Sequence, residues 1–147
     1  MNILKTHSEN QDFVQLVKML DEYLVFMDGE DHAFYDQFNK IDLLNHCVVL
    51  YEGENPVGCG AIKPYDEESA ELKRMFVIPE FRGKGYASKI MEILESWAKD
   101  LGFGSMILET GIHQTDAIQL YQKTYQPIEN YGQYEGVATS VCFKKAL

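Results

Sequence analysis

Apolar residues near the start of the chain recur at intervals of three and four, which is the spacing of an amphipathic helix. The stripe consists of Phe13, Leu16, Val17, Leu20 and Leu24. Ser8 or Asn10 can cap this helix at its start, and the helix should end near Gly29. We expect a short strand over residues 2–6 before it and a second, shorter helix over residues 32–39 after it.

Three strand-like segments follow, separated by turn residues. Residues 48–51 and 57–62 are mostly apolar, and residues 53–56 between them predict the turn of a hairpin. The acidic residues 66–68 predict another turn, after which residues 70–77 form a third strand in antiparallel succession.

The clearest helical pattern covers residues 87–101, where apolar residues form a continuous stripe and Gly102 supplies a natural stop. Residues 106–108 are apolar and predict a short strand buried on both faces. The succession of strand, helix and strand implies a parallel crossover.

A further helix begins near Thr115 or Asp116, either of which can cap it, and the tail holds one or two strands within residues 125–131 and 137–144. The predicted fold class is therefore α/β, of the α+β mixed-sheet kind. We expect a mostly antiparallel sheet with one βαβ crossover and helices on both faces.

Length and composition narrow the class of protein. The 147 residues suit a single domain over residues 1–147. The formal net charge of −10 argues against a nucleic-acid partner and favours a cationic second substrate. The three cysteines show no metal-ligand spacing and predict buried free thiols. No apolar run reaches membrane-spanning length, so we expect no membrane partner. Together with the cysteine pattern, this predicts a cytoplasmic protein without a metal.

The stretch from Glu71 to Ala87 carries the strongest chemical signal. It reads as a strand, a basic turn with Gly83 and Gly85, and the start of a helix. Such a turn points backbone N–H groups and the positive end of a helix dipole at an anion, which predicts a phosphate or pyrophosphate site. A Walker A loop is absent, and Ser88 stands where a dinucleotide fingerprint needs its third glycine.

The turn instead fits the pattern R-x-x-G-x-A through Arg82, Gly85 and Ala87, entered from the strand Glu-Leu-Lys-Arg-Met-Phe-Val. This pattern resembles the acetyl-CoA-binding motif of the GNAT N-acetyltransferase superfamily. The resemblance spans nearly the whole chain, because the predicted elements follow the order of that family. Residues 108–111 and 117–121 also look like the family.

The resemblance implies an acetyl-CoA site built from this stretch. The backbone of the strand residues should pair with the pantetheine arm, and one of their N–H groups should polarise the thioester carbonyl. The amides of the turn should surround the pyrophosphate, helped by two basic side chains. The implied cofactor-binding residues are Met75, Phe76, Val77, Arg82, Gly83, Lys84, Gly85, Tyr86 and Ala87.

The resemblance also implies catalytic residues. Glu71 matches the family position of the general base; at period two it shares a face with Lys73, Met75 and Val77. A cross-strand ion pair with a lysine is the structural alternative for Glu71. Glu109 is the competing base, or a binder of the substrate ammonium.

Tyr121 lies where the family often places a general acid, which would protonate the departing CoA thiolate; core packing is its structural alternative. Two departures from the family pattern are visible nearby. Asp116 stands where many relatives have Asn, which favours helix capping there. After Lys123, Thr124 and Tyr125 replace the usual glycine and aromatic residue, one residue short.

The resemblance implies that the segment around residues 31–39 borders the acceptor pocket and that Tyr131 and Tyr134, near the C-terminus, face the same pocket. Phe34 and Tyr134 are therefore candidate substrate-binding residues. Core packing of Phe34 with Phe38 is the alternative. The predicted function is transfer of an acetyl group from acetyl-CoA to a primary amine of a small molecule or peptide, by direct attack in a ternary complex. A homodimer is plausible by analogy with the family. The rivals are a non-catalytic acyl-CoA sensor or scaffold and, more weakly, a dinucleotide-binding domain.

Overall fold

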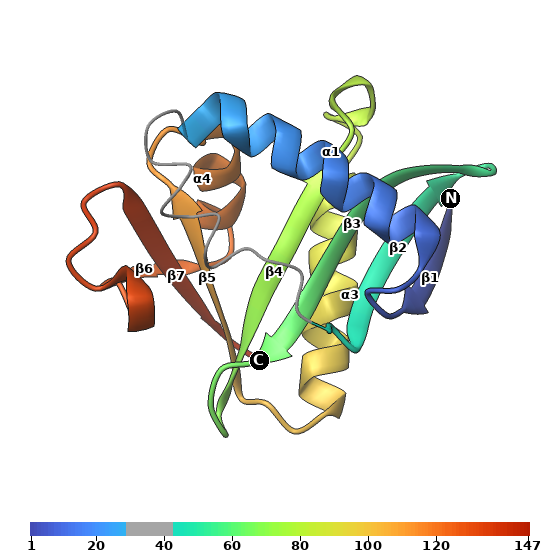
Figure 1. Ribbon diagram of the computed structural model, residues 1–147. Helices are drawn as coiled ribbons and strands as arrows, with labels where there is room; N and C mark the ends of the chain where they lie inside the picture. The colour runs from blue at the N-terminus through green and yellow to red at the C-terminus, as the bar shows by residue number, and fades with distance from the viewer. Residues whose placement is uncertain (29–42) are drawn as a thin grey trace.

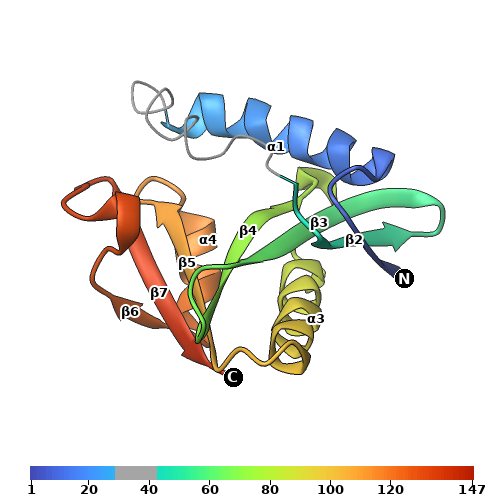
Figure 2. The same ribbon diagram turned by 60° about the horizontal axis from the view of Figure 1, so that its bottom comes forward.

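The computed structural model describes residues 1–28 and 43–147, and the predicted helix over residues 32–39 lies outside them. The described residues form a seven-stranded mixed sheet in the order β1-β2-β3-β4-β5-β7-β6. Figure 2 shows α1 on one face of this sheet and α3 on the other. The predicted fold class is confirmed.

The strands and helices have well-defined bounds. The strands are β1 (Asn2–Thr6), β2 (His46–Glu52), β3 (Asn55–Pro64), β4 (Ser69–Val77), β5 (Ser105–Gly111), β6 (Gln126–Ile128) and β7 (Ser140–Ala146). The described helices are α1 (Gln11–Asp28), α3 (Tyr86–Asp100) and α4 (Thr115–Gln122), with short 3₁₀ turns at Pro79–Phe81 and Gly132–Tyr134. Neighbouring strands pair antiparallel except β4 and β5, whose pairing is parallel as the crossover predicts.

Helix α1 is capped by Asn10, whose Oδ1 accepts a hydrogen bond from the Phe13 N–H at 3.0 Å. The other candidate cap, Ser8, instead accepts a hydrogen bond from the Leu44 N–H at 2.9 Å. The predicted apolar stripe of α1 packs on the face of the sheet that carries Cys47, Val49, Cys59, Ala61 and Phe76. This packing fixes α1 across β2, β3 and β4.

Helix α3 begins after Gly85 and is followed by Gly102, with φ angles of 80° and 98°, conformations that favour glycine at both ends. Its buried face carries Ile90, Met91, Leu94 and Ala98, which join the larger apolar cluster on the opposite face of the sheet. The predicted stripe of this helix is confirmed.

Two local predictions are wrong. The hairpin turn consists of Gly53 and Glu54 alone, because Asn55 and Pro56 already pair with β2. Neither Thr115 nor Asp116 caps α4: both lie in its first turn, Gln114 is at the cap position, and that position has no side-chain capping hydrogen bond.

Strand β4 contains a bulge at the point that matters most for the site. Phe76 is opposite Cys59 while Lys73 is opposite Ala61, so β4 has one residue more than β3 in this interval. Arg74 has φ of 59°, an uncommon conformation for a residue with a side chain.

The bulge corrects the predicted alternation along β4. Leu72 and Met75 both pack in the α3-side cluster, although they are an odd number of residues apart. Glu71 and Lys73 therefore lie on the opposite face from Met75 and Val77, and the prediction that these four share a face is wrong. The physical reason is that one extra residue inverts a period-two pattern.

Strands β4 and β5 pair only over Ser69–Glu71 and Ser105–Ile107, where the hydroxyls of Ser69 and Ser105 are 2.8 Å apart. Beyond this short ladder the two strands diverge (Figure 1). The ends that diverge are the carboxyl ends of both strands, which is where ligands bind in parallel sheets.

Cys47, Cys59 and Cys142 are free and buried, as predicted. Burial raises the pKa of the Cys47 thiol to about 12 and that of Cys142 to about 11. Such thiols remain protonated and unreactive at neutral pH. None of the described helices has the length and hydropathy needed to cross a membrane.

Candidate active site

A cavity of about 400 Å³ lies at the carboxyl end of β4, between the glycine turn and α4. Of the predicted cofactor residues, those that line it are Met75, Phe76, Val77, Arg82, Gly83, Gly85, Tyr86 and Ala87. The first turns of α3 and α4 also face it, through Ser88 and Asp116. One local stretch of sequence thus supplies most of one wall.

The glycine turn keeps its backbone accessible to a ligand. Gly83 and Gly85 have φ angles of 81° and 80°, and a Cβ built on either would meet no atom within 4 Å. The space in front of both backbones is therefore open, and the turn leads directly into the N-terminus of α3. Open N–H groups at a helix N-terminus suit a phosphate.

Lys84 is the predicted cofactor residue that does not line the cavity. Its Nζ lies 3.4 Å from the Glu52 carboxylate and 5.3 Å from the centre of the Phe81 ring. The Tyr86 hydroxyl donates a hydrogen bond to the same carboxylate, which ties the start of α3 to β2. Glu52 therefore draws Lys84 away from the cavity.

Arg82 connects the glycine turn to β4 and α1, although the residue is exposed. Its Nε donates a hydrogen bond to the Val77 carbonyl at 2.9 Å, and its guanidinium lies over the rings of Tyr23 and Phe76. These contacts hold the glycine turn against β4 and place a positive charge beside the cavity.

A second cavity, of about 90 Å³, lies in the divergence of β4 and β5. Its walls are Leu20, Leu24, Leu72, Lys73, Arg74, Met75, Glu109, Thr110, Gly111, Gln114 and Tyr121. Four of these residues, Leu20, Met75, Gln114 and Tyr121, also line the larger cavity. The two cavities are therefore adjacent and meet at these side chains.

Tyr121 stands at this junction. It is buried, and its ring packs against those of Tyr125 and Phe143. Burial, and to a lesser extent the Glu109 carboxylate, raise the pKa of the Tyr121 phenol. The hydroxyl therefore stays protonated at neutral pH and can donate a hydrogen bond to a ligand at the junction.

The altered sequence after Lys123 leaves Tyr121 in both cavity walls. Tyr125 takes a structural position instead: its N–H donates to the Tyr121 carbonyl at 2.8 Å, and its hydroxyl donates to Glu95 at 2.7 Å. Glu95 in turn pairs with Lys145 at 2.8 Å, which joins α3 to β7.

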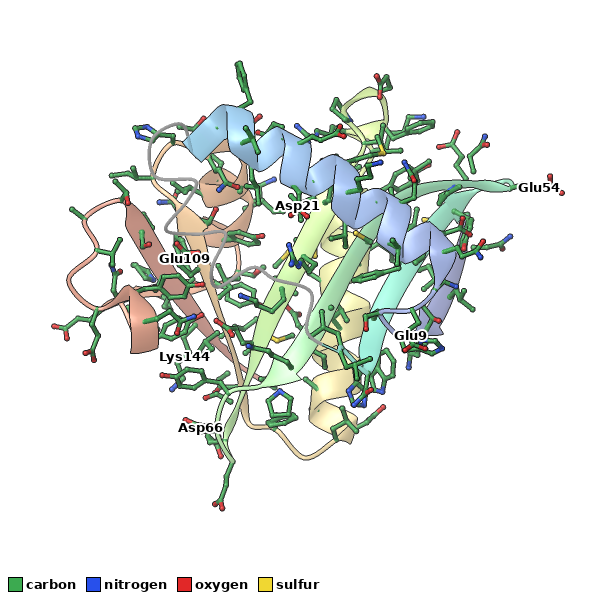
Figure 3. All side chains as sticks on the ribbon, viewed as in Figure 1. Glu9, Asp21, Glu54, Asp66, Glu109 and Lys144 are labelled. Atoms are coloured by element: carbon green, nitrogen blue, oxygen red, sulfur yellow. The ribbon has the colours of Figure 1, made fainter. Side chains whose placement is uncertain are left out.

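The two candidate bases have different surroundings. Glu71 is only 2% exposed, and its Oε2 accepts a hydrogen bond from the Tyr131 hydroxyl at 2.6 Å. Glu109 lies on β5 (Figure 3), lines the smaller cavity and accepts a hydrogen bond from Ser140 at 2.7 Å. Glu71 is absent from the walls of both cavities, whereas Glu109 borders the junction.

The other predicted acceptor residues are separated. Tyr134 is buried against Tyr131, with ring centres 5.7 Å apart, and lines neither cavity. Burial, then the carboxylates of Glu109 and Glu71, raise the pKa of Tyr134. Phe34 lies outside the described residues.

Sequence reasoning missed several cavity residues. Leu20 was assigned to the core stripe of α1, and Gln114 had no assigned role. Lys73 and Arg74 had no assigned role in the site. The available signal for this pair was two adjacent basic residues inside a strand that is otherwise mostly apolar.

The site joins a larger cavity, suited to a phosphate-bearing ligand, with a smaller cavity whose walls include a carboxylate and a phenol. This arrangement is that of a transferase with two substrates. A family model described as the acetyltransferase (GNAT) family matches residues 13–125. On this match, the chain belongs to the GNAT acetyltransferase family.

Individual relatives support this family assignment. The chain is 36% identical over 115 residues to a protein of Azospirillum brasilense named IAA acetyltransferase, which covers 75% of this chain and 73% of that protein. A solved structure from Klebsiella pneumoniae, described as an acyl-CoA N-acyltransferase, has a TM-score of 0.82 at 27% identity, with 99% and 97% of the two chains covered.

A GNAT acetyltransferase of Elizabethkingia anophelis, solved with acetyl-CoA bound, has a TM-score of 0.70 at 18% identity, with 99% of this chain and 97% of that one covered. The fold is thus one in which acetyl-CoA binding is seen. Because the curated relatives carry acetyltransferase names, a purely non-catalytic sensor is not favoured.

Proposed function

We propose that this chain transfers the acetyl group of acetyl-CoA to a primary amine of a small molecule or peptide, by direct attack in a ternary complex. The observation that carries the proposal is the meeting of two cavities at Met75 and Tyr121. One cavity has an anion-binding turn, and the other has charged side chains. Direct transfer requires such adjacency, because reacting groups must come within contact distance.

The larger cavity is proposed to hold acetyl-CoA, which supplies an activated acetyl group when bound. The open backbone at Gly83 and Gly85 and the N-terminus of α3 fit the pyrophosphate. The end of β4, from Met75 to Val77, would pair with the pantetheine arm. A direct ionic contact of Lys84 with the cofactor requires release from Glu52.

A carboxylate on the β4–β5 side would accept the proton of the attacking amine. Glu71 is our first candidate for this base. Because Glu71 is absent from the walls of both cavities, it would act through a water molecule. Glu109 competes for the role from the wall of the smaller cavity. The hydroxyl of Tyr121 would donate a hydrogen bond, and then its proton, to the departing thiolate; its raised pKa keeps the hydroxyl protonated beforehand and makes it a weaker acid.

The test is release of free thiol from acetyl-CoA in the presence of a panel of primary amines. We expect amine-dependent release by the wild-type chain and a fall in kcat of about 10²-fold or more for Tyr121→Phe. Tyr51→Phe is the matched control, because it removes a tyrosine hydroxyl that donates a part-buried hydrogen bond to Asp12, and Tyr51 lines neither cavity.

Amine-independent release, or no release despite tight acetyl-CoA binding, would contradict the proposal. Full activity of Tyr121→Phe would remove Tyr121 from the acid role and leave the overall reaction intact. The two results are therefore separable.

A further inference from the structure

The bulge in β4 places two consecutive basic residues on one face of the strand. Lys73 is opposite Ala61, which packs beneath α1, and Arg74 reaches Asp21 of α1. Leu72 and Met75, on either side of the pair, both pack on the α3 face. In a regular strand one of the two basic side chains would lie on the α3 face instead.

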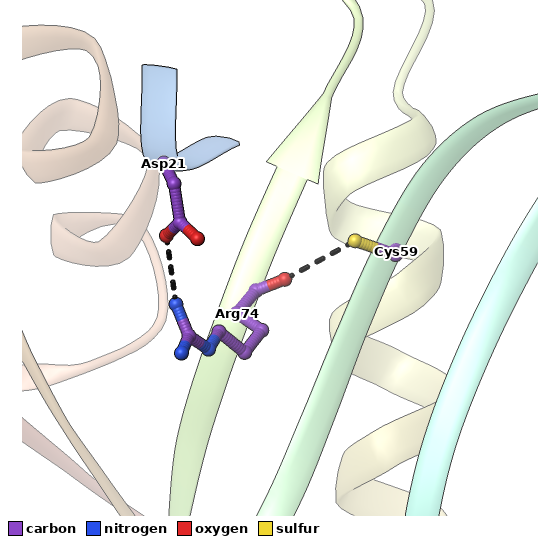
Figure 4. A network of polar contacts seen from close by, with 3 residues as sticks. All are labelled: Asp21, Cys59 and Arg74. Carbon is purple, nitrogen blue, oxygen red and sulfur yellow. Dashed lines mark hydrogen bonds and ion pairs between the residues drawn. The ribbon is translucent and has the colours of Figure 1, made fainter. Parts of the chain in front are cut away.

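The guanidinium of Arg74 has a donor nitrogen that is not hydrogen-bonded to any described residue. Its side chain is 4% exposed, and Nη1 donates to Asp21 at 3.0 Å (Figure 4). Within the described residues, its buried Nη2 has no hydrogen-bond partner. The backbone is held in place as well, since the Cys59 thiol donates to the Arg74 carbonyl at 3.3 Å. A buried, unpaired N–H group is costly, which suggests that a ligand completes it.

The ammonium of Lys73 also lacks a hydrogen-bond partner among the described residues. It forms no hydrogen bond or ion pair with residues 1–28 or 43–147. Burial lowers the pKa of Lys73, and the Glu71 carboxylate only partly opposes this. An anion placed beside Lys73 would offset the cost of burying its charge.

The small cavity therefore has charges of both signs on its walls. Lys73 and Arg74 supply two cations from β4, and Glu109 supplies a carboxylate from β5. A simple amine would satisfy only Glu109. A molecule with a carboxylate beside its amine would satisfy both sides.

We propose that the small cavity binds an amino-acid-like acceptor, with Lys73 and Arg74 holding its carboxylate and Glu109 facing its ammonium group. This inference rests on the proposed function, and it names the substrate class. The positive φ of Arg74 is then part of the specificity device, because the strained bulge puts both cations on one face.

The test compares matched acceptors on the same enzyme preparation. Each amino acid, such as L-alanine or L-phenylalanine, is assayed beside its amide and its decarboxylated amine. The readout is the ratio of kcat/KM for the amino acid to that for each uncharged counterpart. An aminophosphonate and an aminosulfonate distinguish a carboxylate site from a general oxyanion site.

We expect wild type to favour the amino acid by about tenfold or more, as charge-assisted hydrogen bonds would give. Lys73→Met and Arg74→Met should each lower the ratio by a similar factor, mainly through KM. Lys99→Met, an exposed change at the end of α3, should leave the ratio unchanged. A ratio of two kcat/KM values does not depend on the fraction of enzyme that is folded. If Arg74→Met does not fold, Lys73→Met still tests the inference.

Acetylation of the decarboxylated amines as fast as the amino acids would overturn this inference and leave the proposed function standing. A kcat/KM ratio that is unchanged in both Lys73→Met and Arg74→Met would also overturn this inference and leave the proposed function standing. If no amine of either kind is acetylated, the proposed function fails and this inference fails with it.

Discussion

The two adjacent cavities are built in opposite ways. The larger one draws most of its lining from residues 75–88, which include two glycines with open backbones. The smaller one collects side chains from α1, β4, β5 and α4, which are far apart in the sequence. A cosubstrate shared by a whole family can be bound by a local backbone motif, whereas an acceptor is selected by side chains brought together by the fold.

The comparison extends to electrostatics. Two basic side chains of the glycine turn are engaged with neighbours: Arg82, in the wall of the larger cavity, with Val77, and Lys84, outside that wall, with Glu52. In the smaller cavity, Lys73 and one nitrogen of Arg74 have no partner among the described residues. Selectivity for the acceptor is therefore expected to depend on the charges of Lys73 and Arg74.

The largest effect should come from the base. We expect Glu71→Gln to lower kcat by about 10²–10⁴-fold, because an amide cannot accept the amine proton. Glu109→Gln is the paired variant, which should act mainly on the KM of the acceptor. The measurement is steady-state kinetics over pH with acetyl-CoA affinity determined separately. Full turnover and an unchanged pH profile in Glu71→Gln would transfer the role to Glu109.

The glycine turn offers the next effect, confined to the larger cavity. Gly85→Ala must hold an alanine at φ of 80°, which costs about 1–2 kcal/mol and corresponds to about tenfold weaker acetyl-CoA binding if the turn shifts. Gly53→Ala, at φ of 63° in the β2–β3 turn, imposes the same strain away from the site. Calorimetric titration of both variants tests this. Equal affinities would show that the turn does not contact the cofactor.

Gly60 is opposite the bulge and tests how the junction is packed. A Cβ at Gly60 would lie 2.6 Å from the Met75 sulfur and 2.9 Å from Ile90 and Leu94. We expect Gly60→Ala to lower the free energy of unfolding by about 1–3 kcal/mol through overpacking. Chemical denaturation measures the loss. Met75→Ala in the same chain should recover part of it, and simple additivity of the two changes would contradict the clash.

The smallest expected effect is a gain in thermal stability, in contrast to the loss expected for Gly60→Ala. The lowered pKa of Lys73 means that its charged form is disfavoured in the folded state, so the folded chain carries a penalty at neutral pH. The penalty fades as pH rises toward the unfolded pKa of lysine. Lys73→Met should therefore raise Tm by about 1–3 °C at pH 7, with the difference narrowing near pH 10. A lower Tm at pH 7 would assign Lys73 a structural role.

Much of the fold was predictable because its signals are local. The stripe of α3, the cap of α1 by Asn10 and the glycine turn each depend on residues close in sequence. Most cavity-lining residues of the turn were predicted for the same reason, whereas Lys84 was predicted and does not line the cavity. Its pairing with Glu52 links segments that are 32 residues apart.

The acceptor side was less predictable, again for a physical reason. A strict period of two assigned Glu71 and Met75 to one face, and the extra residue at Arg74 inverts that order. No hydrophobic pattern marks a bulge, since Lys73 and Arg74 look like ordinary strand-edge charges. The hydrogen bond from Tyr131 to Glu71 joins residues 60 apart and depends on the folded sheet.

Thermal unfolding of the wild-type chain with acetyl-CoA, CoA and NAD side by side tests the central claim, that the larger cavity binds the acetyl donor. A ligand at 100 times its dissociation constant stabilises the folded state by about 2.7 kcal/mol, which gives a clear shift in Tm. We predict a shift with acetyl-CoA and with CoA, and none with NAD. No shift with either CoA species would contradict the assignment of the cavity.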